Sequence, residues 1–464
     1  MNRATSGTSG TSGTSGTTGL TRRRVLRVAL GTGATAAVTA CGGPQGSVTE
    51  APRTQSAQPI KLVQLSRRAG GTEGLALQQK LMDDFRKVAP NVSVDIVPGT
   101  IPQEQLVVRH AGGDPVDFVE NDWGAWVDLA EGKVIEDLTP YFTRDKLDPS
   151  QFVGESLTSY THQNRRYAVP VSMSVDGLFY NEDLLIGAGV PLPPQDPNKP
   201  WTMDQFLDQA KKLTKAGEQW GFGGNYNCFN TNGVTDGTYY GQRAWDDSRQ
   251  KCLMDTENFR KGAQFWLDAQ WKQGIWPTAA ELDRIRSQPN QNPFLTGKVA
   301  MNVACVVFPK DQLTFKWGLA AIPHSGPAGS KNISARMYPH ALHMGAASKN
   351  KDGIWQLFRW LTRTENASRY PEIAGHSVSP IKGGSDAIQK LRRDTYGVDF
   401  SVLVKNAEGQ IASGQGMLKY PGWKNVTDEL SKKYTDEFKQ NTMGVGEWVK
   451  TATETIDRLL VPKK

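Results

Sequence analysis

The chain has 464 residues, of which 38% are hydrophobic and 22% charged, and its formal net charge at pH 7 is +7. This length exceeds what one compact core usually holds, so we expect two or more domains. Five arginines precede Cys41 and no acidic residue does, which leaves only +2 on the rest of the chain. That balance excludes a general affinity for nucleic acids or anionic membranes. No apolar run is long enough to cross a bilayer.

Residues 1–41 have the features of an export signal. Residues 5–19 repeat Thr-Ser-Gly, and such a polar tract is expected to be disordered. Arg22, Arg23 and Arg24 then precede a short apolar run and the small residues before Cys41, as in a secretory signal peptide. The end of this segment resembles the lipobox of bacterial lipoproteins. The resemblance implies cleavage before Cys41 and attachment of a diacylglycerol to its sulfur.

The same segment gives an expectation about location. Its paired arginines resemble a twin-arginine (Tat) export signal, and an ordinary basic segment of a Sec signal remains the alternative. Residues 42–58, rich in Gly, Pro, Ser, Thr and Gln, would form a flexible tether between the lipid and the folded body. We therefore expect the protein at the extracytoplasmic face of the bacterial cell membrane, anchored by lipid.

Three cysteines follow the signal, and a disulfide is expected in an oxidising extracytoplasmic space. Cys228 and Cys252 lie in polar, loop-like surroundings, whereas Cys305 lies in an apolar strand pattern. We therefore predict a disulfide between Cys228 and Cys252 and a buried thiol at Cys305. The chain has no Cys-x-x-Cys, and the pair His340 and His343 has no carboxylate or Cys beside it, so no metal site is predicted.

In the first part of the folded body, predicted strands alternate with predicted helices. Strands are expected at 60–65, 92–97 and 116–119, with helices between them. Such alternation indicates a largely parallel sheet, which binds ligands at the carboxyl ends of its strands. The loops 66–73 and 120–123 follow two of these strands and are rich in polar and aromatic residues. They are therefore candidate ligand loops.

A pair of short strands in the middle of the chain predicts a change of sheet. One strand, at 165–171, is expected to stop at Pro170, and the next runs from Leu178 to Asn181. Proline removes a hydrogen-bond donor and fixes φ, so it suits the point where a strand leaves one sheet for another. Further on, Thr202 opens a helix with a capping-box sequence.

Several motifs, taken in order, resemble one known family. They are Tyr167-Ala168-Val169-Pro170, then Phe179-Tyr180-Asn181-Glu182-Asp183-Leu184, Pro293-Phe294-Leu295-Thr296-Gly297-Lys298-Val299-Ala300-Met301, Trp317-Gly318-Leu319-Ala320-Ala321-Ile322-Pro323 and Ser348-Lys349-Asn350-Lys351. In this order and spacing the chain resembles the extracellular solute-binding proteins of ABC importers, in the maltose-binding-protein-like group. The resemblance extends over residues 59–464.

The resemblance implies an α/β, two-lobed periplasmic-binding-protein fold of type II, whose lobes are joined by crossing hinge strands and close on a ligand between them. By this analogy lobe 1 comprises 59–169 and 322–362, and lobe 2 comprises 170–321 and 363–464. The sequence departs from the family at Tyr338-Pro339, where Gly-Gly is frequent, and at Cys305-Val306. No specific sugar is therefore carried over.

A carbohydrate presents apolar faces to aromatic rings and hydroxyl groups to polar side chains. Residues of these types lie in the candidate loops, at the predicted hinge and in the second lobe. The candidate ligand residues are Arg67, Thr72, Glu73, Asp122, Trp123, Asp176, Tyr226, Trp245, Tyr338 and His376. No catalytic residue, cofactor or metal is predicted.

The resemblance implies a substrate-binding lipoprotein that captures a sugar or oligosaccharide and delivers it to a permease. The chain has no P-loop, so the expected partners are two permease subunits and a separate ATPase, with the binding protein itself a monomer. Two alternatives stay open: another polar solute (a polyamine, a glycerol-phosphate-like molecule or an acidic sugar) in the same fold, and a secreted glycosidase. For a hydrolase, Gly375-His376-Ser377-Val378-Ser379 lacks the second glycine of a nucleophile elbow.

Overall fold

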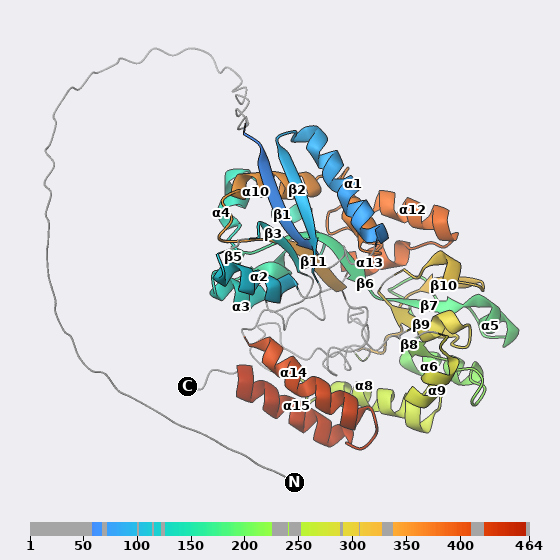
Figure 1. The fold of residues 1–464 in the computed structure, drawn as a ribbon. Coiled ribbons are helices and arrows are strands. Elements are labelled where there is room, and N and C mark those ends of the chain that lie inside the picture. Colours follow the sequence, from blue (N-terminus) through green and yellow to red (C-terminus); the bar gives the residue numbers. More distant parts are fainter. Residues whose placement is uncertain are drawn as a thin grey trace, which may run out of the picture. The chain divides into compact units, whose positions relative to one another are not determined.

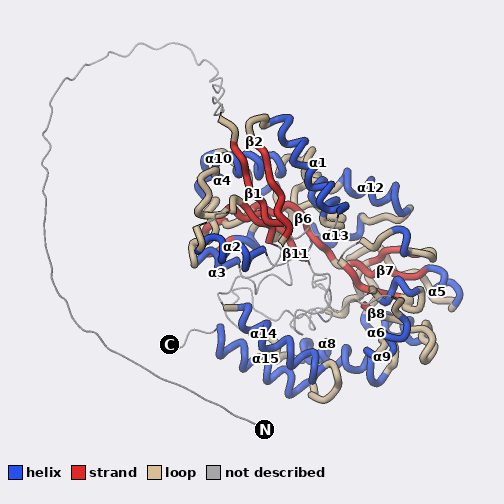
Figure 2. The backbone as a smooth tube through the Cα atoms, viewed as in Figure 1, coloured by secondary structure: helices blue, strands red, loops and turns tan. Residues whose placement is uncertain are grey.

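The structure is a computed structural model. It describes residues 58–66, 72–99, 102–113, 116–121, 126–224, 240, 252–287, 291–305, 307–326, 337–409 and 422–460. All of them belong to one compact unit, Ser56–Lys464. Within it, strands gather into two main sheets with helices packed around them (Figures 1 and 2). Among the described residues, no helix is both long and apolar enough to span a membrane.

The first sheet has five strands in the order β2-β1-β3-β11-β6. They are β1 (Ile60–Ser66), β2 (Val92–Pro98), β3 (Phe118–Asn121), β11 (Met337–Met344) and β6 (Val169–Val175). Strand β1 runs parallel to β2 and β3, whereas β11 runs antiparallel to β3 and β6. The carboxyl ends of β1 and β3 therefore lie at the same edge as the amino end of β11 and the carboxyl end of β6.

The second sheet has four strands in the order β10-β7-β9-β8. They are β10 (Trp317–Ala320), β7 (Gly177–Asn181), β9 (Met301–Ala304) and β8 (Gly223–Gly224). Strand β7 is antiparallel to β9 and β10, and β8 is parallel to β9. A separate pair is formed by β4 (Thr161–His162) and β5 (Arg165–Arg166).

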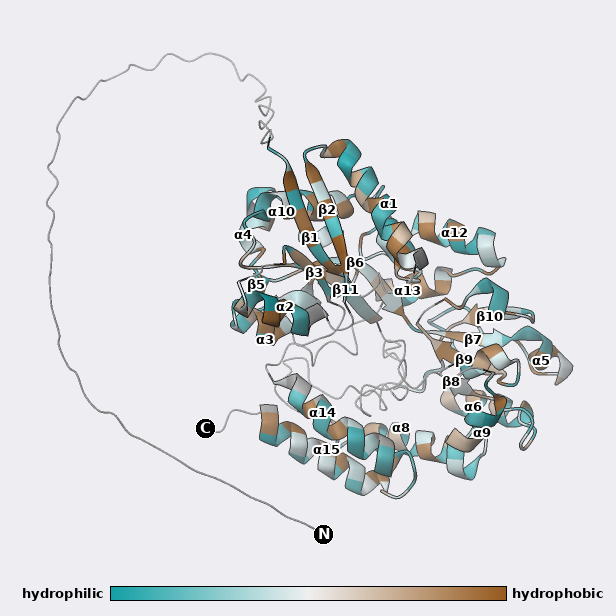
Figure 3. Ribbon diagram, in the orientation of Figure 1, coloured by the Kyte–Doolittle hydropathy of each residue, from teal (hydrophilic) through white to brown (hydrophobic). Residues whose placement is uncertain are grey.

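The helices surround these sheets. They are α1 (Thr72–Val88), α2 (Pro102–Ala111), α3 (Trp126–Glu131), α4 (Thr139–Arg144), α5 (Glu182–Gly187), α6 (Met203–Lys212), α8 (Glu257–Leu267), α9 (Ala279–Ile285), α10 (Lys351–Leu361), α11 (Arg369–Ile373), α12 (Asp386–Tyr396), α13 (Ser401–Gly409), α14 (Trp423–Lys433) and α15 (Val445–Leu460). The predicted capping box is confirmed: Thr202 Oγ1 accepts from the backbone N–H of Gln205 at 3.1 Å, and Gln205 Oε1 accepts from that of Thr202 at 2.9 Å. Helices α14 and α15 carry both hydrophobic and hydrophilic residues (Figure 3), as packing on one side requires.

Strands β6 and β7 carry the chain from the first sheet into the second. Only Asp176 separates them. The predicted change of sheet is confirmed, but it takes place at Asp176 rather than at Pro170. Pro170 lies inside β6 and pairs with Ala341 beside a β-bulge. Because β6 is an edge strand, a proline in it need not interrupt the ladder.

Two segments that the sequence assigned to lobe 2 belong with the first sheet. Residues 170–175 pair with β11. Tyr370 and Ile381, from segment 363–381, are buried in the same core as Leu62 of β1.

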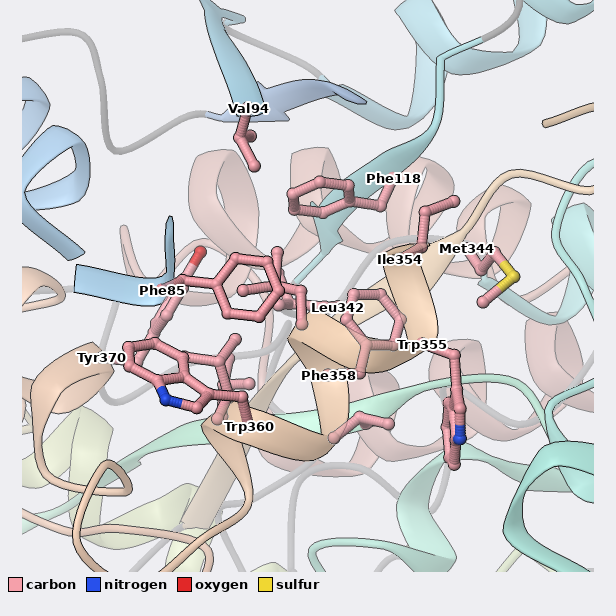
Figure 4. Packing of buried hydrophobic residues seen from close by; sticks show 14 of the residues in the cluster. Phe85, Val94, Phe118, Leu342, Met344, Ile354, Trp355, Phe358, Trp360 and Tyr370 are labelled. Atoms are coloured by element: carbon pink, nitrogen blue, oxygen red, sulfur yellow. The ribbon is translucent and has the colours of Figure 1, made fainter. Parts of the chain in front are cut away.

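The first sheet is covered on one face by an aromatic core. Phe85 of α1 packs on Trp360 of α10 with ring centroids 5.4 Å apart. Phe118 of β3 meets Phe358 edge-on at 5.8 Å. Figure 4 shows these rings interdigitating around Leu342. Such aromatic pairs supply both buried area and preferred geometry, so α1 and α10 are held firmly against the strands.

The second sheet has its own core, and the C-terminal helices are joined to it through a lysine. Lys439, only 7% exposed, places its ammonium 4.9 Å from the ring centre of Trp266 and 5.1 Å from that of Tyr434. It also lies 5.6 Å from the ring of Trp276. Aromatic faces attract a buried cation, so Lys439 connects the core of α14 and α15 to the core beneath the second sheet.

Both described cysteines are half-buried. Cys252 packs against the core of α14 and α15, where burial raises the pKa of its thiol. Its expected partner Cys228 lies outside the described residues, so the pairing of Cys228 with Cys252 stays a prediction. Cys305 follows the last residue of β9 and is half-buried rather than fully buried, because the strand ends one residue earlier.

A glycine permits the close approach of β10 to β7. Gly318 pairs with Tyr180, and a Cβ added at Gly318 would lie 2.2 Å from the phenol oxygen of Tyr180.

We predict that Gly318→Ala lowers the free energy of unfolding by about 2 kcal/mol or more, because the buried ring must move. Urea unfolding measures the change. Gly187→Ala is the matched control, since no atom lies within 4 Å of the added Cβ; an equal loss in both variants would contradict the prediction.

His343 of β11 makes the fold sensitive to acid. The ring is fully buried, and Nδ1 lies 2.9 Å from the carbonyl oxygen of Tyr167. Burial lowers the pKa of His343 from 6.5 to about 4, against a smaller opposing effect of that hydrogen bond. The folded protein therefore keeps this ring neutral at pH values where the unfolded chain binds a proton.

We predict that the contribution of His343 to the free energy of unfolding is fully present above the ordinary pKa of histidine. It decreases by about 3 kcal/mol as the pH falls toward the pKa that His343 has in the folded protein. Urea unfolding at about pH 7 and about pH 4.5 measures this loss. His343→Asn keeps a donor for Tyr167 but does not titrate, so it should reduce the loss. A variant that loses as much stability as the wild type would refute the assignment to His343.

Candidate functional site

Four polar residues lie on one side of the first sheet, where β6 approaches the second sheet. Tyr338 pairs with Ser174, and His340 pairs with Ser172. Residues paired across two strands point to the same side of a sheet, and alternate residues of one strand do so too. All four side chains therefore share one face, which we call the polar face, together with His376.

His376 reaches the polar face from the loop after α11. Its Nδ1 lies 2.7 Å from Ser172 Oγ, and His340 Nε2 lies 2.9 Å from Ser174 Oγ. The two imidazole rings are 4.3 Å apart between centroids, at 32°. Each histidine thus has its own serine partner, and the pair forms a compact group of neutral donors and acceptors.

The polar face lies next to the predicted ligand loops. Asn121, the last residue of β3, pairs with Ala341, so Tyr338 and His340 extend beyond the end of β3. Tyr160 donates from its hydroxyl to the carbonyl of Pro339 at 2.5 Å and fixes this extension. Because parallel strands present their carboxyl ends at one edge, the loops after β1 and β3 begin at the edge where the polar face lies.

Three of the ten predicted ligand residues have described side chains, and the structure brings them to one region. Tyr338 and His376 belong to the polar face, and Asp176 follows β6 two residues after Ser174. Asp176 is fully buried, and its backbone carbonyl accepts from Asn406 Nδ2 at 3.3 Å. Its position therefore supports a role at the strand crossing more than a direct ligand contact.

The other predicted ligand residues cannot be placed in the same way. Thr72 and Glu73 form the first turn of α1, and their side chains lie outside the described part of the chain. The remaining residues lie outside the described residues altogether: Arg67, Asp122, Trp123, Tyr226 and Trp245. The lipidation candidate Cys41 lies outside them too. For all of these the sequence-based expectation stands as a prediction.

A second set of buried polar residues supports the ends of β1 and β3. The Tyr370 hydroxyl donates to Glu120 Oε2 at 3.0 Å and accepts from Gln64 Nε2 at 3.4 Å. Gln78 donates to Ser66 Oγ at 2.9 Å. These bonds tie the ends of β1 and β3 to α11, whose C-terminus leads directly to His376.

Two surface grooves lie elsewhere. One, of about 690 Å³, lies between α1 and the open edge of β2, and another, of about 490 Å³, lies between α6 and α8. Asp176, Tyr338 and His376, the predicted ligand residues whose side chains are described, line neither groove. In the described part of the chain, no group of three or more His, Cys, Asp or Glu side chains could hold a metal ion.

Comparison with known proteins identifies the family. A model of the bacterial extracellular solute-binding proteins matches residues 68–368. The chain belongs to this family. Solute-binding proteins of this kind bind their substrates and do not transform them, and they work outside the cytoplasm with the permease components of ABC importers.

Solved structures agree with this assignment. The chain is similar to an ABC substrate-binding protein of Listeria monocytogenes in complex with cycloalternan, with a TM-score of 0.69, 17% identity, and coverage of 86% of this chain and 99% of that one. A sugar transporter protein of Rhizobium etli in an open conformation has a TM-score of 0.67 and 19% identity to this chain, with coverage of 87% of this chain and 100% of that one. UgpB of Mycobacterium tuberculosis in complex with glycerophosphocholine has a TM-score of 0.67 and 17% identity, with coverage of 87% of this chain and 99% of that one. The predicted two-lobed periplasmic-binding-protein fold is therefore confirmed.

Sequence analysis missed most of the polar face of this solute-binding protein. It treated His340 only as a partner of His343 in an improbable metal pair, yet His340 and His343 belong to different environments on either side of a β-bulge. The run Val171-Ser172-Met173-Ser174-Val175 did carry a signal. Its strict alternation predicts a strand with one polar face, and its position just before the crossing could have marked that face as part of a site.

Proposed function

We propose that this protein is the substrate-binding lipoprotein of an ABC importer and captures a sugar or oligosaccharide between its lobes. The polar face carries the proposal. Ser172, Ser174, His340 and His376 offer hydroxyl and imidazole groups in fixed directions, and Tyr338 adds an aromatic ring. Neutral groups of this kind suit the hydroxyls and apolar faces of a carbohydrate.

The proposed mechanism is closure of two halves over the ligand. The polar face lies on the first sheet, and Asp176 joins it to the second sheet without an intervening loop. Trp123 and the other loop residues after β1 and β3 would contribute from lobe 1, and Tyr226 and Trp245 from lobe 2. A short crossing strand of this kind can act as a hinge, because a few residues absorb the change in backbone angles.

The proposal includes an anchored location. Cleavage before Cys41 and lipid attachment to it would hold the protein at the outer face of the cell membrane, with residues 42–58 as the tether. There the protein, as a monomer, would deliver its ligand to two permease subunits powered by a separate ATPase. Export through the Tat pathway is part of the same proposal and rests on Arg22 and Arg23.

A second candidate ligand is a glycerol-phosphate-like molecule. It is favoured by the fold similarity to a protein that was solved with glycerophosphocholine. The hydrogen-bond partners of the two histidine rings described above are serine hydroxyls, which carry no positive charge. A phosphodiester would therefore need a cation from elsewhere, such as Arg67 in the loop after β1.

The proposal predicts reversible binding of a carbohydrate without turnover. Titration calorimetry of the purified protein with mono- and oligosaccharides, including maltose, should give a dissociation constant near the micromolar range, or about −8 kcal/mol. Glycerophosphocholine serves as the competing ligand class. If glycerophosphocholine gives a heat of binding and no sugar does, the ligand is a phosphodiester and the proposal of a sugar is wrong. Release of shortened sugars would instead indicate a glycosidase.

Trp123 tests the loop after β3. We predict that Trp123→Ala weakens sugar binding at least tenfold, because the ligand loses an aromatic face, while the unfolding temperature stays unchanged. Trp271→Ala is the matched control, since Trp271 is 44% exposed and lies in the segment after α8. Calorimetry with the sugar bound by the wild type measures both variants. Unchanged affinity in Trp123→Ala would remove this residue from the site.

A further inference from the structure

The segment Gly375–Ser379, which we call the His376 arm, is held by hydrogen bonds from several elements. The Gly375 carbonyl accepts from the N–H of Val307 at 3.1 Å, and the His376 N–H donates to Pro371 at 2.8 Å. The Val378 carbonyl accepts from the N–H of Met173 in β6 at 3.1 Å. Gly375 has φ of +68°, a conformation that favours glycine. The arm is therefore fixed at both of its ends.

Helix α12 holds the middle of the arm with two side chains. Arg392 Nη2 donates to the carbonyl oxygen of His376 at 2.8 Å, and Gln389 Nε2 donates to the carbonyl oxygen of Ser377. Gln389 and Arg392 are 8% and 9% exposed and three residues apart, so they lie on one face of the helix. They act on the backbone immediately at and after His376.

The burial of the Arg392 guanidinium costs free energy. Burial lowers the pKa of its guanidinium, against smaller opposing effects of Tyr396 and Glu372. In the described part of the chain, Arg392 forms no ion pair. A buried charge without a counter-ion costs free energy. The next residue, Arg393, is 54% exposed and lies 3.9 Å from Asp399, which shows that α12 can also place an arginine in solvent.

We propose that Gln389 and Arg392 are positioning residues for ligand binding, which set the His376 ring against Ser172 and His340 before the ligand arrives. The inference rests on the proposed function only in placing His376 at the ligand. A ring held in its bound position loses less entropy on binding, so affinity depends on residues that never touch the ligand. Helix α12, outside the polar face, thus becomes part of the binding apparatus.

The arm can be tested without any ligand. The protein has six histidines, and histidine labelled with 13C at Cε1 gives one NMR resonance for each. His376→Asn identifies the resonance of His376. In Arg392→Met we expect this resonance to move toward that of an exposed imidazole, whereas Arg392→Lys, which keeps a donor, should leave it near the wild-type position. Arg393→Met is the matched control and should change nothing.

Binding provides the second readout. Calorimetry with maltose and with glycerophosphocholine should show affinity reduced about tenfold in Arg392→Met, largely restored in Arg392→Lys and unchanged in Arg393→Met. If Arg392→Met does not fold, Gln389→Met takes its place in both experiments. This variant removes an uncharged donor to the same arm, and we expect changes in the same direction.

The outcomes separate the two proposals. An unchanged His376 resonance in both Arg392→Met and Gln389→Met would overturn the positioning role. A displaced resonance with unchanged affinity would overturn it too, because His376 would then not lie at the ligand. If the wild type binds neither maltose nor glycerophosphocholine, the proposed ligand classes fail, while the resonance still decides whether α12 fixes the arm.

Discussion

The continuity of β6 and β7 through Asp176 is the constraint on which the other features depend. Strand β6 supplies an edge to the first sheet, and β7 supplies an inner strand to the second, so Asp176 alone separates the two along this part of the chain. A polar side chain placed just before the crossing is fixed by the first sheet and lies close in the chain to the second. Ser172 and Ser174 occupy that position. They connect the crossing to β11 through His340 and to the His376 arm. A group built on a strand in this way is placed more accurately than one built on a loop.

Buried polar groups at the strand ends are stable because they satisfy one another. An unpaired buried donor or acceptor costs about 1–3 kcal/mol, whereas a paired one contributes about 1 kcal/mol. Tyr370 meets Glu120 and Gln64, and Ser172 and Ser174 meet His376 and His340. Both sets converge on the segment from α11 to His376. The first sheet therefore presents a pre-ordered edge to its loops, and the free energy of ordering that edge is supplied by folding rather than by the ligand.

The sequence predicted the fold better than the site. Order and spacing of short motifs identified the family, and the capping box at Thr202 was visible because capping depends on local residues. The crossing was misplaced at Pro170, since whether a proline can stay in a strand depends on whether that strand is an edge, a tertiary property. The partner of Cys252 was chosen by local polarity, yet its thiol packs against a helical core from the far end of the chain. His340 was overlooked because only its contacts with His376 and with a serine on another strand mark it as a site residue. No local pattern in the sequence encodes these contacts.

The histidine pair also limits the charge that the polar face can carry. Two imidazolium ions with centroids 4.3 Å apart would repel strongly in a buried setting, so the two rings together accommodate one positive charge at most. One nitrogen of each ring has a serine hydroxyl as its hydrogen-bond partner. A strongly anionic ligand would find no arginine or lysine among the five described residues of the polar face. A polyol can instead alternate its hydroxyls as donors and acceptors against serine and imidazole. The geometry of His340 and His376 is thus compatible with the uncharged ligand that we propose.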